Sequence, residues 1–220
     1  MSQHLQREIE KLKQMIVSVG AMAEESLRRA VAAFQERDRT LARSVIVDDV
    51  KLDRMEIDVE EEGLKVLALH QPVAIDLRFI IAVLKMNRDL ERVGDLSANI
   101  AERAIDLLAA EEPAEAFDLS DMAAKVQDML KLCLDALVGL DSGLAQRVCA
   151  SDNEVDDLNR QVYQWARQQM RRSPGSSANL LCFLSVSHCL ERIADHATNI
   201  AKDVIYMLEG EIVRHRGATP

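Results

Sequence analysis

The sequence predicts an all-α protein made of two tandem three-helix bundles, with six long helices related by an internal duplication. Apolar residues recur at helical spacing along nearly all of the 220 residues. Only eight glycines and four prolines interrupt this pattern, and no segment has the character of a strand. Aromatic residues make up 3% of the chain, so the core must consist of aliphatic side chains that suit helix-on-helix packing.

Three helices are expected in the first half of the chain. The first spans residues 5–35, where one buried stripe follows the 3-4 spacing of a helix face: Leu5, Ile9, Leu12, Ile16, Val19 and Ala23. Asp38 is a suitable N-cap for a second helix that extends to residue 69. Pro72 disfavours helical backbone at the residue before it, so a third helix is expected over residues 73–110.

Three more helices are expected in the second half. The fourth spans residues 119–138, and Asp141 is a suitable N-cap for a fifth that ends near residue 172. Ser176 or Ser177 would cap the sixth, and Gly210 would end it.

The connections between these helices predict the domain organisation. The linker around Pro113 divides the chain into two domains, residues 1–112 and 113–220, and residues 214–220 are expected to fray. Short connections imply antiparallel neighbours within each bundle, and we expect the two bundles to lie end to end.

Two sets of sequence matches indicate a tandem duplication. Residues 91–101, ERVGDLSANIA, recur 100 positions later as residues 191–201, ERIADHATNIA. A second set lies upstream at an offset of 103, where Ala33, Asp38, Leu41, Ala42, Val45, Asp49 and Asp53 align with Ala136, Asp141, Leu144, Ala145, Val148, Asp152 and Asp156. Because both sets occur in the same order at nearly the same offset, each half is expected to carry the same local site.

Composition and charge exclude several classes of protein. The net charge of −10 disfavours binding to nucleic acid, whose phosphates it would repel. The longest strictly apolar run, residues 79–84, is far shorter than the roughly 20 residues of a membrane span. The N-terminus is charged at once, so we expect a cytoplasmic protein. No two cysteines form a CxxC pair, and all four are expected to be buried reduced thiols: Cys133, Cys149, Cys182 and Cys189.

Acidic and amide side chains form a repeated pattern on the second and third helices of each half. Residues spaced four apart share one face of a helix. In the first half these are Asp49 and Asp53, with Glu91, Asp95 and Asn99; in the second half they are Asp152 and Asp156, with Glu191, Asp195 and Asn199. The first stripe continues through Glu56 and Glu60, where the second has Asn159 and Tyr163, so the second stripe is less acidic. If metal ions bind to these stripes, the two sites are expected to differ in their occupancy or in the number of ions.

Like charges four residues apart weaken a helix, so a repeated acidic stripe calls for compensation. Arg92 and Arg192 would supply part of it. A bound cation would supply more, because carboxylate and amide oxygens suit Mg²⁺, Mn²⁺, Ca²⁺, Fe or Zn²⁺. The alternative is that these acids are only solvated helix faces. His188 lies three residues before Glu191, and we expect the other histidines to be ordinary surface or turn residues: His4, His70, His196 and His215.

The repeated ERxxDxxxNIA, the upstream DxxxD and the QPVAIDLR turn at residues 71–78 resemble the PhoU family of phosphate-uptake regulators over nearly the whole chain. The resemblance implies a non-enzymatic accessory protein that restrains the phosphate-starvation response. Its implied partners are the phosphate ABC transporter, through the ATPase subunit, and a sensor histidine kinase. It also implies a homodimer and metal clusters, such as Fe, Zn, Mg or Mn, on the ten acidic and amide positions given above.

Two other functions remain open from the residues themselves. A carboxylate-bridged di-metal oxidase of the ferritin-like kind would need Glu-x-x-His pairs, and here His188 precedes Glu191 in the reverse order. A metal-binding helical scaffold without a phosphate-specific role is the second alternative. The sequence contains no nucleophile–base pair, no Gly-rich phosphate loop and no nucleotide fingerprint, and it offers no obvious binding nest for phosphate.

Overall fold

The computed structural model describes residues 3–109, 116–172 and 177–210, and within these ranges it contains helices and no strand. The helices are α1 (Gln3–Gln35), α2 (Arg39–His70), α3 (Ala74–Ala109), α4 (Ser120–Gly139), α5 (Ser142–Arg172) and α6 (Ser177–Glu209). The predicted all-α class with six long helices is confirmed. Expected and observed helix ends differ by a residue or two, which is the usual scatter of helix boundaries.

The predicted N-caps of α2 and α5 form as expected. Asp38 Oδ1 accepts hydrogen bonds from the backbone N–H groups of Thr40, at 2.8 Å, and Leu41, at 3.0 Å. Asp141 Oδ1 accepts in the same way from Gly143, at 2.8 Å, and Leu144, at 3.1 Å. Each aspartate thereby satisfies helix N–H groups that have no carbonyl partner within the helix. The duplicated aspartates therefore perform the same structural task in both halves.

The C-terminal ends of α2 and α6 also follow the sequence. The helix α2 ends just before Pro72, with Gln71 in the left-handed region at φ 45°. Gly210 ends α6 at φ 74°, a conformation that glycine adopts without steric cost, and its N–H donates to the carbonyl of Tyr206 at 2.9 Å. The expected Ser176 cap, the boundary between residues 112 and 113 and the fraying of residues 214–220 lie outside the described residues.

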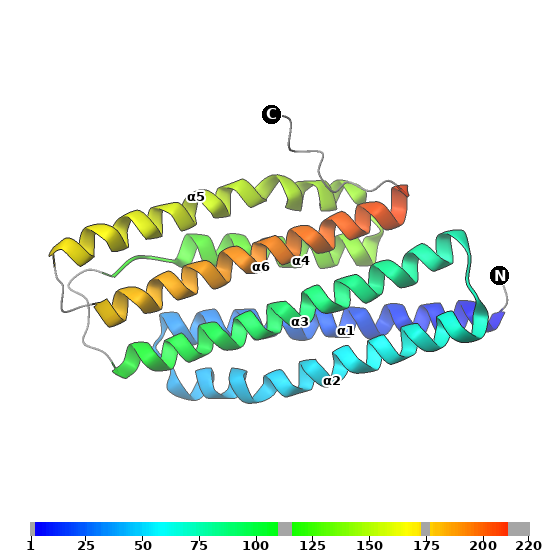
Figure 1. Ribbon diagram of the computed structural model, residues 1–220, viewed down its shortest axis with the longest axis horizontal. Helices are drawn as coiled ribbons and strands as arrows, with labels where there is room; N and C mark the ends of the chain where they lie inside the picture. The colour runs from blue at the N-terminus through cyan, green and yellow to red at the C-terminus, as the bar shows by residue number, and fades with distance from the viewer. Residues whose placement is uncertain (1–2, 110–115, 173–176, 211–220) are drawn as a thin grey trace.

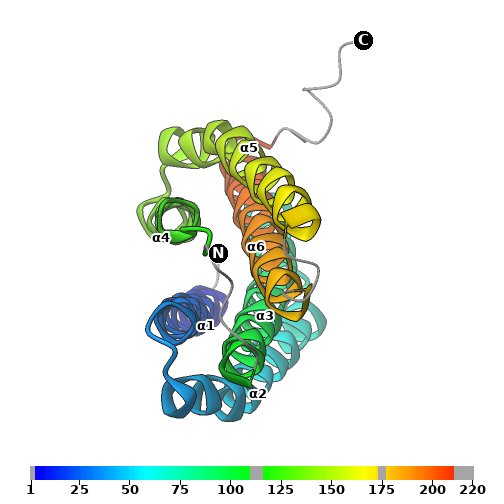
Figure 2. The same ribbon diagram turned by 90° about the vertical axis from the view of Figure 1, so that its left-hand side faces the viewer.

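The two bundles lie side by side along their lengths, so the expected end-to-end arrangement is wrong. The helices α3 and α6 run antiparallel next to each other at the centre of the molecule, and they make the most extensive contact in the fold (Figure 1). Figure 2 shows α5, α6, α3 and α2 as one curved layer, with α4 and α1 on its concave side. The physical reason is that α3 and α6 are apolar on more than one face, and end-to-end packing would leave the second face exposed.

One continuous aliphatic core runs through both halves. A short chain of aromatic rings also crosses from one half to the other. Phe34 of α1 packs edge-on against Phe183 of α6, with ring centroids 5.4 Å apart, and Phe183 packs against Trp165 of α5 at 5.5 Å. Phe117 lies on the far side of Trp165, also at 5.5 Å. Within the described residues, no helix combines the length and apolar character needed to cross a membrane.

Candidate functional site

The first acidic cluster forms where α2 packs against α3. It consists of Asp49 and Asp53 on α2 and Glu91 and Asp95 on α3, all of them half-buried. Burial, together with the nearby charges of Asp53 and Asp95, raises the pKa of Asp49 from 3.8 to about 6. Burial and then the charge of Asp95 likewise raise the pKa of Glu91. The structure therefore brings the predicted carboxylates of the two helices into one electrostatic cluster.

The cluster extends one turn further along α2 through Glu56. Burial raises the pKa of Glu56, and the charges of Glu60 and Asp53 raise it further. The backbone of the same residue is tied to α3, because Asn87 Nδ2 donates to the carbonyl of Glu56 at 2.8 Å. The sequence-based extension of the first stripe is thus present in space.

A glycine gives Asp49 its position against α3. A Cβ atom at Gly94 would lie 3.1 Å from Asp49 Oδ1 and 3.0 Å from Leu52 Cδ1, so the bare backbone of α3 leaves room for both side chains. Asp49 Oδ1 is buried and has no hydrogen-bond partner among the described residues. A buried carboxylate oxygen without a donor is costly, and a cation is one group that would satisfy it.

The second acidic cluster forms in the same way between α5 and α6. Burial raises the pKa of Asp152, as do the charges of Asp195 and Asp156. Burial and the charges of Asp195 and Asp156 also raise the pKa of Glu191. The duplicated sequence pattern therefore produces two matching clusters, one in each half.

The two clusters differ in their hydrogen bonds. Thr198 Oγ1 donates to Asp152 Oδ1 at 3.2 Å, whereas Ala98 occupies the matching position in the first half and has no donor to offer Asp49. His188 Nδ1 lies 3.2 Å from Glu191 Oε2, and its matching residue is Arg88. Asp152 therefore has a protein donor that Asp49 lacks, while Glu191 Oε2 of the second cluster is, like Asp49 Oδ1, buried without a hydrogen-bond partner among the described residues.

The two arginines expected to compensate the stripes behave differently. Arg92 pairs with Asp95 at 2.7 Å and with Glu91 at 3.4 Å, so the expectation for Arg92 is confirmed. Arg192 makes no ion pair with the described residues, and its side chain lines a separate groove. The expectation for Arg192 is therefore wrong.

The two predicted asparagines lie at the edge of the acidic clusters. Asn99 and Asn199 are both exposed, and neither hydrogen-bonds to a cluster carboxylate within the described part of the chain. Asn199 lines the same groove as Arg192. The structure therefore gathers the eight predicted carboxylates and leaves the two amides outside them.

The fit of a metal to these residues is good in chemistry and incomplete in geometry. The oxygens of two facing helices, with an unsatisfied Asp49 Oδ1, form the donor set that hard cations prefer. Among the described residues, however, no three His, Cys, Asp or Glu side chains converge as a ready metal site. Side-chain rearrangement would be needed before three carboxylates could share one ion.

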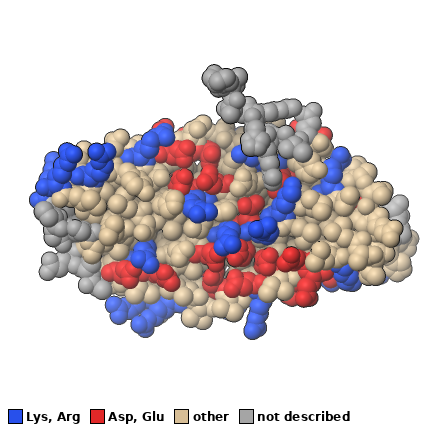
Figure 3. Space-filling view, in the orientation of Figure 1, with Lys and Arg blue, Asp and Glu red and all other residues tan. Residues whose placement is uncertain are grey.

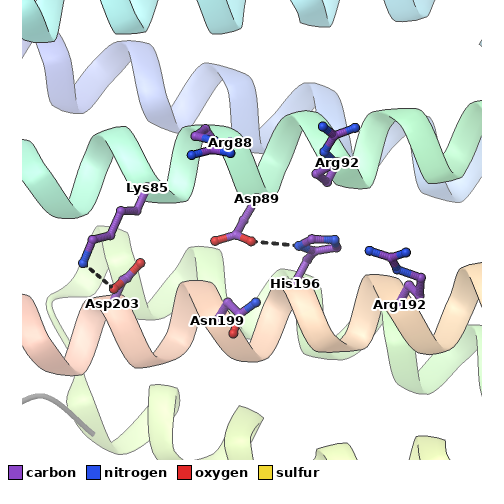
Figure 4. Close-up of a pocket in the computed structure, with 8 residues that line it drawn as sticks. All are labelled: Lys85, Arg88, Asp89, Arg92, Arg192, His196, Asn199 and Asp203. Atoms are coloured by element: carbon purple, nitrogen blue, oxygen red, sulfur yellow. Dashed lines mark hydrogen bonds and ion pairs between the residues drawn. The ribbon is translucent and has the colours of Figure 1, made fainter. Parts of the chain in front are cut away.

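A groove between α3 and α6 contains functional candidates that the sequence analysis did not identify. Its lining residues are Lys85, Arg88, Asp89, Arg92, Arg192, His196, Asn199 and Asp203. Figure 4 shows Lys85 reaching across to Asp203, at 3.5 Å, and Asp89 reaching His196 Nδ1, at 2.8 Å. Charge spacing could have indicated the α3 side, because Lys85, Arg88 and Arg92 share one helix face.

His196 is therefore not an ordinary surface residue, as the sequence analysis expected. Its side chain is only 13% exposed and it bridges the two halves through Asp89. The expectation failed because His196 lies off the acidic stripe, on a face of α6 that another half of the chain covers. The four cysteines are free, and all are buried except the half-buried Cys149; burial raises the pKa of Cys189 to about 11.

Comparison with known proteins shows a match over nearly the whole chain. The family model of the PhoU domain matches twice, over residues 16–104 and 119–204. The phosphate-specific transport system accessory protein PhoU homolog of Pseudomonas putida is 35% identical over 98% of this chain and 85% of its own. The PhoU homolog 1 of Thermotoga maritima, of the same description, is 31% identical over 94% of this chain and 90% of its own.

Solved structures agree with these sequence matches. The crystal structure of PhoU from Pseudomonas aeruginosa superimposes with a TM-score of 0.91 at 33% identity, covering 94% of this chain and 99% of that one. The phosphate transport system regulatory protein PhoU from Streptococcus pneumoniae gives 0.87 at 26% identity, with 95% and 99% covered. These matches cover both halves of the chain and the whole fold, and the chain belongs to the PhoU family.

Proposed function

We propose that this protein is a cytoplasmic accessory regulator of phosphate homeostasis. In this role it represses the phosphate-starvation response and modulates the phosphate ABC transporter through protein contacts, without catalysis of its own. Its partners would be the ATPase subunit of the transporter and a sensor histidine kinase. The observation that carries the proposal is the match to PhoU proteins of phosphate transport systems over nearly the whole of both chains.

A protein-contact role is supported by an apolar stripe on the outer face of α2. Exposed apolar side chains that are grouped on one surface mark sites of protein interaction. The exposed members of the stripe follow helical spacing and are Val47, Val50, Ile57 and Leu64. An apolar helix face of this kind suits docking against another helix. We propose that the chain also forms a homodimer, which sedimentation equilibrium would test directly.

We further propose that the two acidic clusters hold divalent or iron-type cations that fix the packing of α2 on α3 and of α5 on α6. Asp49, Asp53, Glu91 and Asp95 would be the ligands in the first half, with Asn99 at the edge. In the second half the ligands would be Asp152, Asp156, Glu191 and Asp195, with Asn199 at the edge. A bound cation would offset the burial and the like-charge repulsion that raise the pKa of Asp49 and Glu91.

The first experiment is an alkaline phosphatase assay in high phosphate, in the source organism with this gene deleted. We expect constitutive activity after deletion and repression after the wild-type gene is restored. Glu91→Ala with Asp95→Ala should fail to restore repression if the first cluster sets the active shape.

A matched control comes from the same helix. Glu102 and Asp106 have the same four-residue spacing on α3, and both are exposed beside Arg103. Replacing both with Ala also removes two negative charges from α3, but outside the cluster, and should leave repression intact. Metal content of the purified variants, measured by mass spectrometry, separates the two parts of the proposal. Normal repression in the deletion strain would overturn the phosphate role and leave a metal-binding helical scaffold as the alternative.

A further inference from the structure

The groove between α3 and α6 concentrates positive charge on an acidic protein. The chain carries a net charge of −10, yet four cationic side chains and one histidine line this groove, which encloses about 400 Å³. Figure 3 shows basic side chains at the centre of this face with acidic side chains on both sides of them. The packing of the two halves creates the groove, and neither half contains it alone.

The ion pairs within the groove leave two arginines uncompensated. Lys85 is paired with Asp203 at 3.5 Å, and the carboxylate of Asp89 is engaged by His196 at 2.8 Å. Arg92 is paired with acids of its own helix. Arg88 and Arg192 make no ion pair with any described residue, although Arg88 is close enough to Glu56 to lower its pKa.

Two guanidinium groups that make no ion pair with the described residues line this groove, and this indicates an anion site. Figure 4 shows Arg192 of α6 beside His196 and Arg88 over α3 beyond Asp89, with the Asp89–His196 pair between the two arginines. An anion bound in the groove would offset positive charge that no carboxylate of the described residues neutralises by an ion pair. Guanidinium groups match the paired oxygens of a phosphoryl group, to which they donate two parallel hydrogen bonds.

We propose that the α3–α6 groove binds a phosphoryl oxyanion, either as inorganic phosphate or as the phosphate end of a nucleotide. Arg88 and Arg192 are the direct donors, one from each half of the chain. Asp89 and His196 are positioning residues, since their contact fixes the separation of α3 and α6 at that level. The ligand therefore joins the two halves, and its binding reports on their relative position.

The surroundings of the groove favour a small anion over an acidic peptide. Arg92 is paired with Glu91 and Asp95, so the first acidic cluster begins at the edge of the basic groove. An extended acidic chain leaving the groove would meet these carboxylates and be repelled. A compact oxyanion would remain within the basic part. The proposal stands on the groove alone and does not depend on the transporter role.

The test is isothermal titration of the full-length protein in a chelator, which keeps cations out of the acidic clusters. The probes are inorganic phosphate, ATP without Mg²⁺, adenosine and a deca-glutamate peptide. We expect phosphate or ATP to bind, and Arg88→Gln with Arg192→Gln to weaken binding at least tenfold, because two charged hydrogen bonds are lost. Phosphate binding would identify a free oxyanion as the ligand, and binding of ATP alone would identify the phosphate end of a nucleotide.

A matched double variant separates site binding from the effect of overall charge. Arg103 and Arg160 are surface arginines paired with acids three residues away, so Arg103→Gln with Arg160→Gln removes the same two charges outside the groove. We expect this variant to bind like the wild type. An equal loss in both double variants would overturn the proposal, as would no binding of phosphate or ATP at millimolar concentration, or tighter binding of deca-glutamate or adenosine than of either.

Histidine ring signals in NMR spectra locate the bound ligand and check the fold of each variant. The His196 ring lines the groove, whereas His188 is exposed beside Glu191 and outside it. Phosphate or ATP should shift the His196 signal in a saturable manner and leave the His188 signal in place. Shifts confined to His188 would place the anion elsewhere and overturn the assignment to the groove.

Discussion

Asp49 shows how one missing hydrogen-bond donor can distinguish two copies of a duplicated site. Asp49 and Asp152 hold matching positions, and burial raises the pKa of both. Thr198 donates to Asp152, while Ala98 leaves Asp49 Oδ1 without a donor among the described residues. Asp49 therefore has a greater need for a cation than Asp152, whereas Asp49 Oδ1 and Glu191 Oε2 are alike in being buried without a hydrogen-bond partner among the described residues.

The raised pKa of Asp49 predicts a stabilising substitution. The folded-state pKa is about 6 and the ordinary value is 3.8, so the fold disfavours the charged form of Asp49. Ionised Asp49 therefore lowers the free energy of unfolding, and this effect reaches its full size above pH 6. Asp49→Asn should therefore raise the free energy of unfolding by about 1 kcal/mol at pH 8 in a chelator, after allowance for solvent screening. The gain should shrink as the pH falls through 6 and vanish below 3.8.

The neighbouring Asp48 provides the control for this prediction. Hydrogen bonds from Lys51 and Arg29 lower the pKa of Asp48, so Asp48→Asn should not stabilise the protein at any pH. Urea unfolding followed by circular dichroism from pH 4 to pH 8 measures both variants. A loss of stability for Asp49→Asn at pH 8 would contradict the electrostatic account of the first cluster.

The lowered pKa of Glu62 on α2 predicts that its contribution to the free energy of unfolding depends on pH in the opposite sense. Its hydrogen bonds from Lys11 of α1 and Lys65 lower its pKa from 4.5 to about 2, so it stabilises the fold above pH 4.5 and loses that effect as the pH falls towards 2. Both lysines are about half exposed, so the discounted contribution is about 1 kcal/mol. Glu62→Gln should lower the free energy of unfolding at pH 7, and the exposed Glu61→Gln should not. An undiminished effect of Glu62→Gln at pH 3 would argue against the ion pairs.

At the scale of helices, the second and third helices of each half are joined by a partly buried polar contact at a matching position. Asn87 donates to the backbone of Glu56 in the first half. In the second half, the matching Ser187 Oγ donates to Asn159 Oδ1 at 2.7 Å. The residue types differ, yet the contact occurs at the same level of each bundle, directly beside the acidic cluster. These contacts fix the register of the two helices that supply the carboxylates.

The close approach of α1 and α4 predicts a steric effect at Gly20. A Cβ atom there would lie 2.5 Å from Leu134 Cδ2, the movable tip of a side chain on α4. Gly20→Ala should be nearly neutral, because the shift of Leu134 offsets the helix propensity gained. Gly20→Val should cost about 1–3 kcal/mol, since a branched side chain cannot be accommodated by moving Leu134 alone.

Thermal unfolding followed by circular dichroism tests this prediction. Gly139→Val is the control, because Gly139 is exposed and a Cβ atom there would meet nothing closer than 4.0 Å. Adding Leu134→Ala to Gly20→Val should recover part of the loss. A neutral Gly20→Val would mean that α1 and α4 are not held closely together in solution.

At the scale of the whole molecule, the two halves should unfold as one unit. The contact of α3 with α6 and the ring chain from Phe34 to Trp165 join them through a shared core. Trp165, the single tryptophan, lies in the second half, so its fluorescence reports that half, while circular dichroism reports all helices. In urea the two signals should change with the same midpoint. A tryptophan transition clearly separated from the helical one would show that the halves are independent domains.

Helix positions and caps were predictable from the sequence because they depend on local interactions. The hydrogen bonds of Asp38 and Asp141 connect residues two or three positions apart. The proximity of Asp49 and Asp95 was predicted for a different reason. A short connection forces α2 and α3 to lie antiparallel, so acidic stripes on their facing sides must meet.

The role of His196 could not be predicted in the same way. Its partner Asp89 is 107 residues away, and nothing local to either residue identifies the other. Arg192 was expected to mirror Arg92 because their sequences match. The duplication preserves residue types along each helix but not the contacts across the line where the halves meet.

The sequence by itself determined the helical class, the six helices, the duplication and the four carboxylates of each half, because these follow from periodicity and from short-range geometry. Only the tertiary structure decided that the bundles lie side by side, that Asp49 lacks a donor and that a basic groove forms between α3 and α6. Each of α3 and α6 packs one face inside its own bundle, and these features depend on which further face it packs against the other half. That choice is made by packing between distant parts of the chain, and no local pattern encodes it.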